Sequence, residues 1–152
     1  ASVTHLPFED NSFDVTWNAG VIEHFDHDGQ IRAVREMLRV TKPEGSVIVI
    51  VPSAAASVYR FAKTFADKHN LWQPGYEEPI LSLKELGKAS GSSVVREYRT
   101  GFIAQFHFLK YLFWKVTPLR LGWCGLVELA GLLRPLNRLP GYLLVAVIKK
   151  TG

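Results

Sequence analysis

The stretch that decides the fold runs from Leu6 to Phe25 and reads LPFEDNSFDVTWNAGVIEHF. Within it, a polar turn at residues 9–12 leads into a short apolar strand at residues 13–17, which stops at the small pair Ala19-Gly20 before a helical pattern begins. Strand, tight turn and helix in this order are typical of an α/β nucleotide site, where ligands bind beyond the carboxyl ends of strands. The stretch therefore predicts an α/β sheet with a ligand site at that edge.

The next landmark combines a helix, a turn and a strand. Apolar residues recur at helical spacing from about residue 28 to residue 40, with charged residues between them, which predicts an amphipathic helix covering a sheet. Pro43 and Gly45 predict a turn after this helix. The uninterrupted β-branched run at residues 47–51 is expected for a central parallel strand buried on both faces.

Three further elements follow along the chain. Residues 93–99 predict a strand at a sheet edge, because at least one of its faces is polar, and residues 142–148 predict the final strand. A helix is expected at about residues 55–68, with its apolar side chains buried: Val58, Phe61, Ala62 and Phe65.

The residues of two stretches resemble the sequences of class I S-adenosylmethionine-dependent methyltransferases. The first is the opening stretch, with Leu-Pro-Phe, an acidic turn, Asn-Ser-Phe-Asp, Asn-Ala-Gly and Val-Ile-Glu-His-Phe; the second is Leu38-Arg39-Val40-Thr41-Lys42-Pro43-Glu44-Gly45-Ser46 with the strand after it. The resemblance implies a Rossmann-like α/β methyltransferase sheet, here partial with about four strands, the last one antiparallel between its two predecessors. It also implies methyl transfer, with S-adenosyl-L-methionine as the cofactor.

Members of this family begin with a strand and a Gly-rich turn that packs against the cofactor, and an acidic residue after the second strand holds the ribose hydroxyls. The chain starts at Ala1, a few residues before the first landmark. We therefore expect the carboxyl-terminal part of a methyltransferase, a fragment with an incomplete cofactor site. An exposed sheet edge and poor solubility would follow from missing strands.

The expected cofactor-binding residues lie around the first strand. Asn18, Ala19 and Gly20 stand where that strand ends, and small residues there let a ligand approach the backbone closely. The alternative is that Ala19-Gly20 is only a tight turn. Ser2 stands where the family commonly has an Asp that accepts from the adenine amino group, and backbone amides near Val3 can support adenine binding there.

Glu23 and His24 open the helix after the turn and are the candidate catalytic residues. His24 suits a general base that takes a proton from a substrate hydroxyl. In quinone-biosynthesis O-methyltransferases a similar Glu-x-x-Glu-His set holds a divalent cation, but Gly20 replaces the first Glu here, so no metal site is expected. An equally open interpretation is that Glu-His only shapes and caps this turn.

The absence of one motif narrows the class of methyl acceptor that we expect. The Asn/Asp-Pro-Pro-Tyr motif of amino-methylating enzymes does not occur in the sequence, which favours an oxygen or carbon nucleophile on a small or lipid-like acceptor. Because methyl transfer from a sulfonium is intrinsically favourable, positioning the nucleophile in line with the methyl group can supply much of the catalysis.

Residues 102–140 form an apolar, basic insert between residues 1–101 and 141–152, which carry the Rossmann-like domain. The insert holds five Lys or Arg residues and one acid. It predicts two apolar helical pieces, the second at residues 125–133, separated by a break at Pro118 and Gly122. Charges interrupt every window long enough for a membrane span. Three interpretations stay open: a lid with an apolar wall for substrate, a buried cap, or a membrane-surface segment. The candidate substrate or lid residues are Phe106, Lys110 and Trp114.

Composition limits the remaining classes. The chain has 152 residues and 47% hydrophobic residues, enough for one core, and its net charge of +4 resides in the insert, which argues against a general nucleic-acid-binding face. A single cysteine, Cys124, and an acidic amino end indicate a reducing, cytoplasmic location, with membrane association left open. The alternative to an enzyme is a non-catalytic methyltransferase-like module that binds a membrane or partner through residues 102–140.

Overall fold

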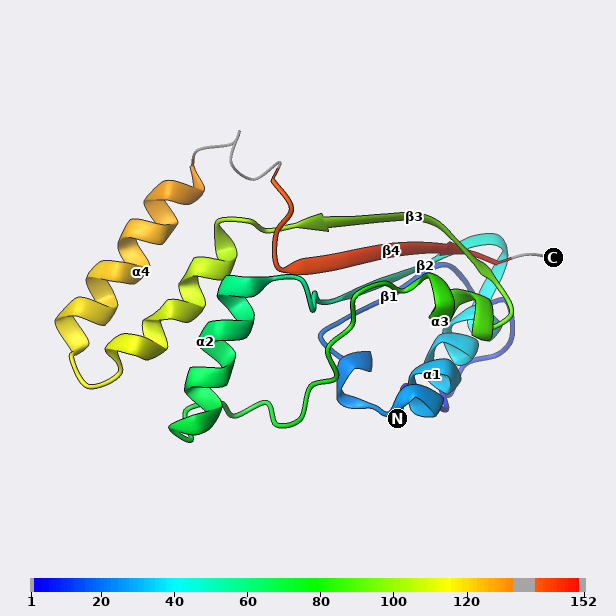
Figure 1. Ribbon diagram of the computed structural model, residues 1–152. Coiled ribbons are helices and arrows are strands. Elements are labelled where there is room, and N and C mark those ends of the chain that lie inside the picture. Colours follow the sequence, from blue (N-terminus) through cyan, green and yellow to red (C-terminus); the bar gives the residue numbers. More distant parts are fainter. Residues whose placement is uncertain (1, 133–138, 151–152) are drawn as a thin grey trace. The chain divides into compact units, whose positions relative to one another are not determined.

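The computed structural model describes residues 2–132 and 139–150 (Figure 1). The chain divides into two compact units. The first comprises Ala1–Pro52, Tyr76–Tyr98 and Leu144–Gly152, and the second comprises Ser53–Gly75 and Arg99–Leu143. In chain order, the elements are β1 (Phe13–Ala19), η1 (Ile22–His24), α1 (His27–Val40), β2 (Thr41–Pro52), α2 (Ser57–Lys68), α3 (Lys84–Ala89), β3 (Ser93–Thr100), η2 (Ala104–Phe113), α4 (Thr117–Gly131) and β4 (Leu143–Lys149).

The four strands form one mixed sheet in the order β1-β2-β4-β3. β1 and β2 are parallel, with Thr16 opposite Val47 and Ala19 opposite Ile50. β4 lies between β2 and β3 and runs in the opposite direction to both (Figure 1). The Rossmann-like α/β prediction is therefore confirmed, including the partial sheet, the antiparallel last strand and the edge position of β3.

The turn predicted at Pro43 and Gly45 lies inside β2 and not before it. Pairing with β1 shifts between Phe13, opposite Thr41, and Val15, opposite Ser46, so the intervening residues bulge out of the ladder. A Cβ atom on Gly45 would lie 2.8 Å from the Lys42 carbonyl oxygen and 2.9 Å from the Asp14 carbonyl oxygen. Only glycine fits this close approach of backbone segments.

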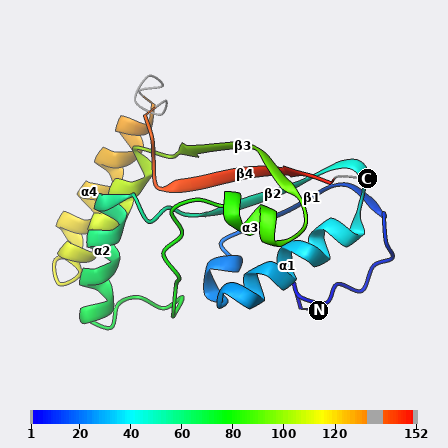
Figure 2. The ribbon, with the colours of Figure 1, turned by 45° about the vertical axis from the view of Figure 1, so that its right-hand side comes forward.

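The core of the first unit lies between the sheet and helices α1 and α3, which cover the same face (Figures 1 and 2). Asp26 caps α1 by accepting a hydrogen bond from the Gly29 amide at 2.8 Å. The buried core residues of α1, β2, α3 and β4, with Leu83 directly before α3, include Ala33, Val34, Met37, Val47, Val49, Val51, Leu86, Leu144, Ala146 and Ile148.

The opposite face of the sheet in the first unit is more exposed. Val15 is 51% exposed and Trp17 is 68% exposed, and both belong to β1. In β2, Val47, Val49 and Val51 are buried, whereas the alternate residues Ile48 and Ile50 are only partly buried. The prediction that this strand is buried on both faces is therefore wrong for the part of the chain that the structure describes.

In the second unit, α2 packs against η2, and η2 packs against α4 (Figure 1). Aromatic rings hold α2 to the segments around it: the Tyr59 centroid lies 4.7 Å from that of Phe108 and 5.4 Å from that of Tyr142. Burial raises the pKa of the Tyr142 hydroxyl. The predicted burial of Phe61 is wrong, because this side chain is 59% exposed and the buried positions are Tyr59, Ala62 and Ala66. The face containing the aromatic Tyr59 packs inward.

The predicted break between two helical pieces falls earlier than expected. Pro118 occupies the first turn of α4, where its missing amide hydrogen costs no hydrogen bond, and the helix continues through Gly122 and Gly125 to Gly131. Leu133, the predicted end of this piece, lies outside the described residues. Among residues 2–132 and 139–150, no helix combines the length and apolar character needed to cross a bilayer.

Candidate functional site

The turn after β1 is fixed by Gly20. Its φ angle is +68°, a left-handed conformation that glycine adopts without steric cost, and its amide donates to the Ile50 carbonyl oxygen at 3.0 Å. The hydrogen bond holds the end of β1 against β2. The carboxyl ends of these two parallel strands therefore meet at the edge where α/β proteins bind ligands.

Asn18 contributes a buried polar side chain next to this turn. It is 7% exposed, and its Nδ2 donates to the Met37 Sδ at 3.0 Å. Its Oδ1 is buried and has no hydrogen-bond partner among the described residues. Leaving a buried acceptor unsatisfied costs about 1–3 kcal/mol, so a donor is expected to complete this site.

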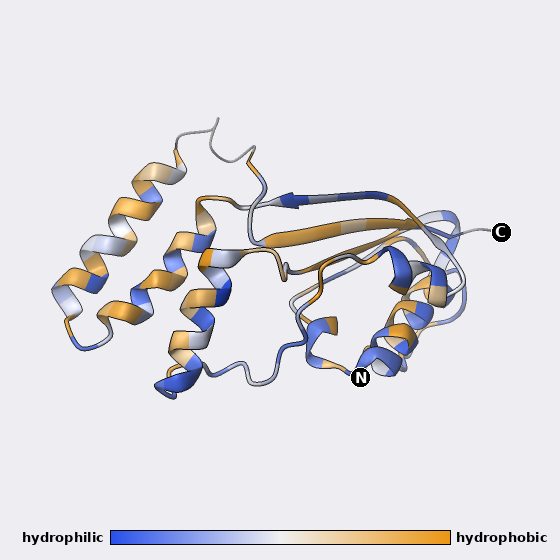
Figure 3. Ribbon diagram, viewed as in Figure 1, coloured by the Kyte–Doolittle hydropathy of each residue, from blue (hydrophilic) through white to orange (hydrophobic). Residues whose placement is uncertain are grey.

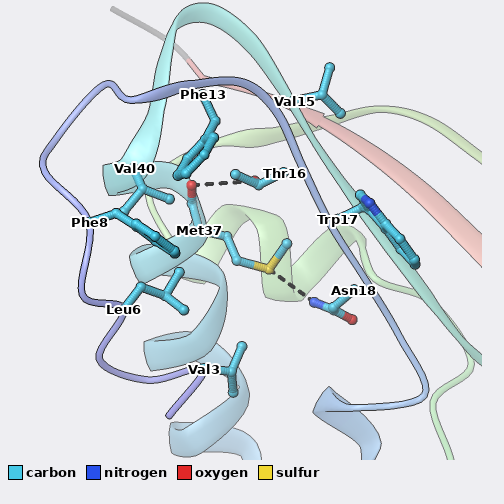
Figure 4. Close-up of a pocket in the computed structure, with 10 residues that line it drawn as sticks. All are labelled: Val3, Leu6, Phe8, Phe13, Val15, Thr16, Trp17, Asn18, Met37 and Val40. Atoms are coloured by element: carbon cyan, nitrogen blue, oxygen red, sulfur yellow. Dashed lines mark hydrogen bonds between the residues drawn. The ribbon is translucent and has the colours of Figure 1, made fainter. Parts of the chain in front are cut away.

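Asn18 opens onto a mainly apolar pocket of about 340 Å³ in the first unit (Figure 4). Thr16, which faces α1, adds a hydroxyl that is 2.8 Å from the Thr41 Oγ1. The other lining residues are Val3, Leu6, Phe8, Phe13, Val15, Trp17, Met37 and Val40. Of the predicted cofactor residues, the structure thus brings Val3 and Asn18 together.

The remaining predicted cofactor residues do not line this pocket. The Ser2 side chain is exposed and lies in a turn, with its Oγ 2.8 Å from the Thr4 Oγ1. Ala19 and Gly20 are exposed at the carboxyl end of β1. They form the backbone turn directly after Asn18, as the sequence predicted, and are not among the residues that line the pocket.

Glu23 and His24 lie in η1 with different surroundings. Glu23 is 2% exposed, and its Oε1 would be 3.6 Å from a Cβ atom on Gly20. His24 is exposed, and its Nδ1 is 2.5 Å from the Tyr76 carbonyl oxygen. A carbonyl oxygen only accepts, so Nδ1 carries the hydrogen and the neutral imidazole keeps the lone pair on Nε2. This tautomer leaves Nε2 as the proton acceptor.

Sequence reasoning missed Arg39, which clamps the amino-terminal segment to α1. Its guanidinium donates to the carbonyl oxygens of Leu6 at 3.1 Å and Phe8 at 2.9 Å, and to an Asp10 carboxylate oxygen at 2.6 Å. Two of these partners, Leu6 and Phe8, line the pocket that contains Asn18. The i,i+3 spacing of Glu36 and Arg39 was the available signal, although it could not reveal the contacts with residues 6–10.

The same network perturbs the Glu36 carboxylate. Hydrogen bonds from the Arg39 side chain and from the Leu6 amide stabilise its charged form and lower its pKa from 4.5 to about 2. The Glu36 carboxylate also raises the pKa of Arg39, which stays fully charged. The amino-terminal wall of the pocket is therefore held by an ionised cluster.

The three predicted substrate or lid residues separate into two places in the second unit. Lys110 and Trp114 line a pocket of about 420 Å³ together with Arg120. Phe106 lines a different, apolar pocket of about 170 Å³ beside Trp123, whose Nε1 donates to the Phe106 carbonyl oxygen at 2.8 Å. No cluster of three or more His, Cys, Asp or Glu side chains that could hold a metal ion occurs in residues 2–132 and 139–150.

Comparisons with known proteins agree with this geometry. Residues 1–49 match the family described as "Methyltransferase domain". The chain is 42% identical over 57 residues to glycine/sarcosine/dimethylglycine N-methyltransferase from Actinopolyspora halophila, covering 37% of this chain and 10% of that protein. It is 40% identical over 60 residues to "Probable tRNA methyltransferase 9B" from Mus musculus, covering 39% of this chain and 13% of that protein.

A solved structure extends the likeness over the whole chain. A SAM-dependent methyltransferase from Thermotoga maritima, described as a possible histamine N-methyltransferase, superposes with a TM-score of 0.64 at 17% identity, covering 99% of this chain and 62% of that one. The predicted resemblance to class I S-adenosylmethionine-dependent methyltransferases is confirmed at the level of the amino-terminal third in sequence and of the whole chain in fold. The chain spans 62% of this structure, and its matches cover small parts of the curated relatives.

Proposed function

We propose that this protein takes part in transfer of a methyl group from S-adenosyl-L-methionine. The observation that carries the proposal is the turn after β1, where the left-handed Gly20 ends the strand beside the buried, unsatisfied Oδ1 of Asn18. The turn lies within the residues that match the methyltransferase domain. The matches cover only a small part of the length of the curated relatives, so the methyltransferase activity is proposed for the whole protein.

The residues around β1 fit such a cofactor. The cofactor carries an ammonium group, ribose hydroxyls and an adenine amino group, any of which can donate to Asn18 Oδ1. Val3 and the apolar pocket wall suit its uncharged surface. Ser2, Ala19 and Gly20 complete the proposed cofactor set through a hydroxyl and exposed backbone. When bound, the cofactor supplies a sulfonium-activated methyl group.

His24 is the proposed general base. Its Nδ1 hydrogen is engaged by the Tyr76 carbonyl oxygen, so Nε2 is oriented and free to take the proton of an acceptor hydroxyl. Glu23 is its buried neighbour in η1, and its Oε1 would lie 3.6 Å from a Cβ atom on Gly20. The proposed acceptor is a small or lipid-like molecule methylated at oxygen or carbon, which rests on the absence of the amino-methylating motif. Two compared proteins have names that describe nitrogen methylation, so amines belong among the acceptors tested.

A thermal-shift series tests the cofactor proposal. S-adenosylhomocysteine should raise the Tm of the parent chain, because a ligand that binds only the folded state stabilises it. Asn18→Ala removes the acceptor and should weaken binding by roughly five- to tenfold, in line with a hydrogen bond worth about 1 kcal/mol. Gln73→Ala, at an exposed residue of the second unit, is the control and should leave the shift unchanged. Equal shifts for both variants would remove Asn18 from the site.

A further inference from the structure

The outward surface of α4 is unusually apolar for a helix that faces solvent. Five leucines, four in α4 and one directly after it, are between 57% and 73% exposed. Of the two charged side chains of α4, Glu128 is exposed and Arg120 is half-buried. The exposed apolar residues are Leu119, Leu121, Leu126, Leu129 and Leu132, and we call them the leucine face.

The opposite side of α4 is already used for packing within the second unit. Val127 is buried, and Trp123 packs against η2, with its ring centroid 6.0 Å from that of Phe113. The helix therefore carries apolar residues on both its packed side and its exposed side, and orange and white predominate in its hydropathy colouring (Figure 3). A helix of this kind normally has both sides covered, so the leucine face is expected to contact another apolar phase.

A basic pocket adjoins the leucine face. The cavity of about 420 Å³ is lined by Lys110 and Arg120, by the rings of Tyr111 and Trp114, and by Leu121 of the leucine face; Leu71 and Cys124 complete it. No acid lines this pocket, and neither cation forms an ion pair within the described part of the chain. The Lys110 Nζ lies 5.5 Å from the Tyr111 ring centroid. Two cations and two aromatic rings suit an anionic group attached to an apolar body.

Charge in the sequence is strongly divided between the two units. The residues of the second unit include nine Lys or Arg and two acids, a net charge of +7. The first unit has nine Lys or Arg and twelve acids, a net charge of −3. The unit that exposes the leucine face is thus the one that an anionic surface attracts.

We propose that the second unit binds the surface of membranes that contain anionic phospholipids. The leucine face enters the apolar boundary of the bilayer, while Lys110 and Arg120 hold headgroup phosphates at the adjoining pocket. Lys115, whose Nζ lies 5.0 Å from the Trp114 ring centroid, adds a third cation beside an interfacial aromatic residue. Packing of a second copy on the same face would bring like-charged units together, which disfavours a dimer. The proposal does not depend on the methyltransferase function.

Vesicle flotation of the 152-residue chain tests the proposal. The chain should float with vesicles of phosphatidylcholine and phosphatidylglycerol, less with phosphatidylcholine alone, and less as salt is raised. The double variant Lys110→Gln/Arg120→Gln should weaken binding to the anionic vesicles by about tenfold or more. Arg32→Gln/Lys88→Gln removes two exposed cations from the first unit and should leave binding unchanged.

A second pair of variants separates the apolar contribution. Leu126→Ser/Leu129→Ser should reduce binding to both kinds of vesicle, whereas Leu81→Ser/Val95→Ser, at exposed apolar residues of the first unit, should not. Circular dichroism and denaturant unfolding establish that each variant is folded before it is compared. Equal losses from both pairs would contradict a specific leucine face.

Three results would overturn the proposal. The first is absence of flotation of the folded parent chain, or flotation that does not depend on anionic lipid. The second is binding of soluble glycerol phosphate that is lost in Lys110→Gln/Arg120→Gln, with no binding of the parent chain to vesicles. The third is a vesicle-free dimer, detected by sedimentation velocity, that dissociates in Leu126→Ser/Leu129→Ser; it would assign the leucine face to a second copy.

Discussion

At the scale of single residues, the most informative group is the ionised cluster of Glu36 and Arg39. The Glu36 pKa is about 2 in the folded chain and close to 4.5 when unfolded, so the unfolded state binds the proton first as pH falls. The stability that this carboxylate contributes is fully present above pH 4.5 and is lost between pH 4.5 and about 2. The amino-terminal wall of the Asn18 pocket should loosen over the same range.

Glu36→Gln tests this linkage. The variant should unfold more easily than the parent at neutral pH, by roughly 1–2 kcal/mol for loss of a charge-assisted hydrogen-bond network. Urea unfolding followed across pH should show the two proteins converging as the pH approaches 2. A difference in unfolding free energy that stays constant over this range would show that the carboxylate charge is not the stabilising feature.

The role of His24 is also decided at the residue scale. If Nε2 is the general base, His24→Ala should lower kcat by about 10²- to 10⁴-fold with little change in KM for the methylated acceptor. His27→Ala, at an exposed residue where α1 begins, is the matched control. Production of S-adenosylhomocysteine reports the rate. An unchanged kcat with reduced stability would favour the interpretation that Glu-His only shapes the turn.

At the scale of elements, the strands and helices that rest on local pattern could be predicted from the sequence. The run at residues 47–51, the amphipathic residues 28–40 and the apolar carboxyl-terminal strand have strong periodic or β-branched signals, and each forms its expected element. The turn at Gly20 was predicted because Ala19-Gly20 interrupts the pattern. Asn18 was chosen because it stands where the predicted strand ends, and Val3 because the resemblance implies adenine contacts near Ser2. The pocket that the two residues share was not predictable.

The errors also have physical causes. Pro118 and Gly122 look like helix breakers, but Pro in a first turn costs nothing and a single glycine costs only about 1 kcal/mol, so α4 forms through both. Periodicity could not choose which side of α2 packs inward, because Phe61 and Tyr59 are both aromatic. The Arg39 clamp joins residues 29 to 33 positions apart, and no local pattern specifies such a contact.

Glycine substitutions test the assignment of these elements. Gly125→Ala should stabilise the chain by about 0.5–1 kcal/mol, because the added methyl group meets no atom and alanine favours the helix. Gly20→Ala should destabilise it by about 1–2 kcal/mol through the left-handed φ. Gly45→Ala should be more damaging, since its methyl group would collide with two backbone oxygens. Chemical denaturation of the three variants gives the order; a neutral Gly45→Ala would contradict the bulge in β2.

At the scale of the whole molecule, two features stand apart from an ordinary closed domain. The first unit leaves Val15 and Trp17 exposed on β1, and the second exposes the leucine face on α4. Exposure of Val15 and Trp17 is expected when no other element packs on that face of the sheet. The chain spans 62% of the solved structure that it resembles. Each unit thus presents an apolar surface of its own.

The exposed face of β1 predicts self-association at high concentration. Trp17→Arg should reduce light scattering of concentrated solutions with no loss of unfolding free energy, because the side chain is already 68% exposed. Leu81→Arg, at a residue 61% exposed in the same unit, is the control for added charge. Identical scattering from both variants would show that net charge alone governs solubility and that this face has no special role.

The central claim is that the residues around β1 form a site that binds S-adenosylmethionine and its product S-adenosylhomocysteine. Isothermal titration of S-adenosylhomocysteine into the 152-residue chain tests it most directly, because the product needs no methyl acceptor. The account predicts saturable one-to-one binding that weakens in Asn18→Ala. Absence of binding heat and of any Tm shift for the folded parent chain would contradict it.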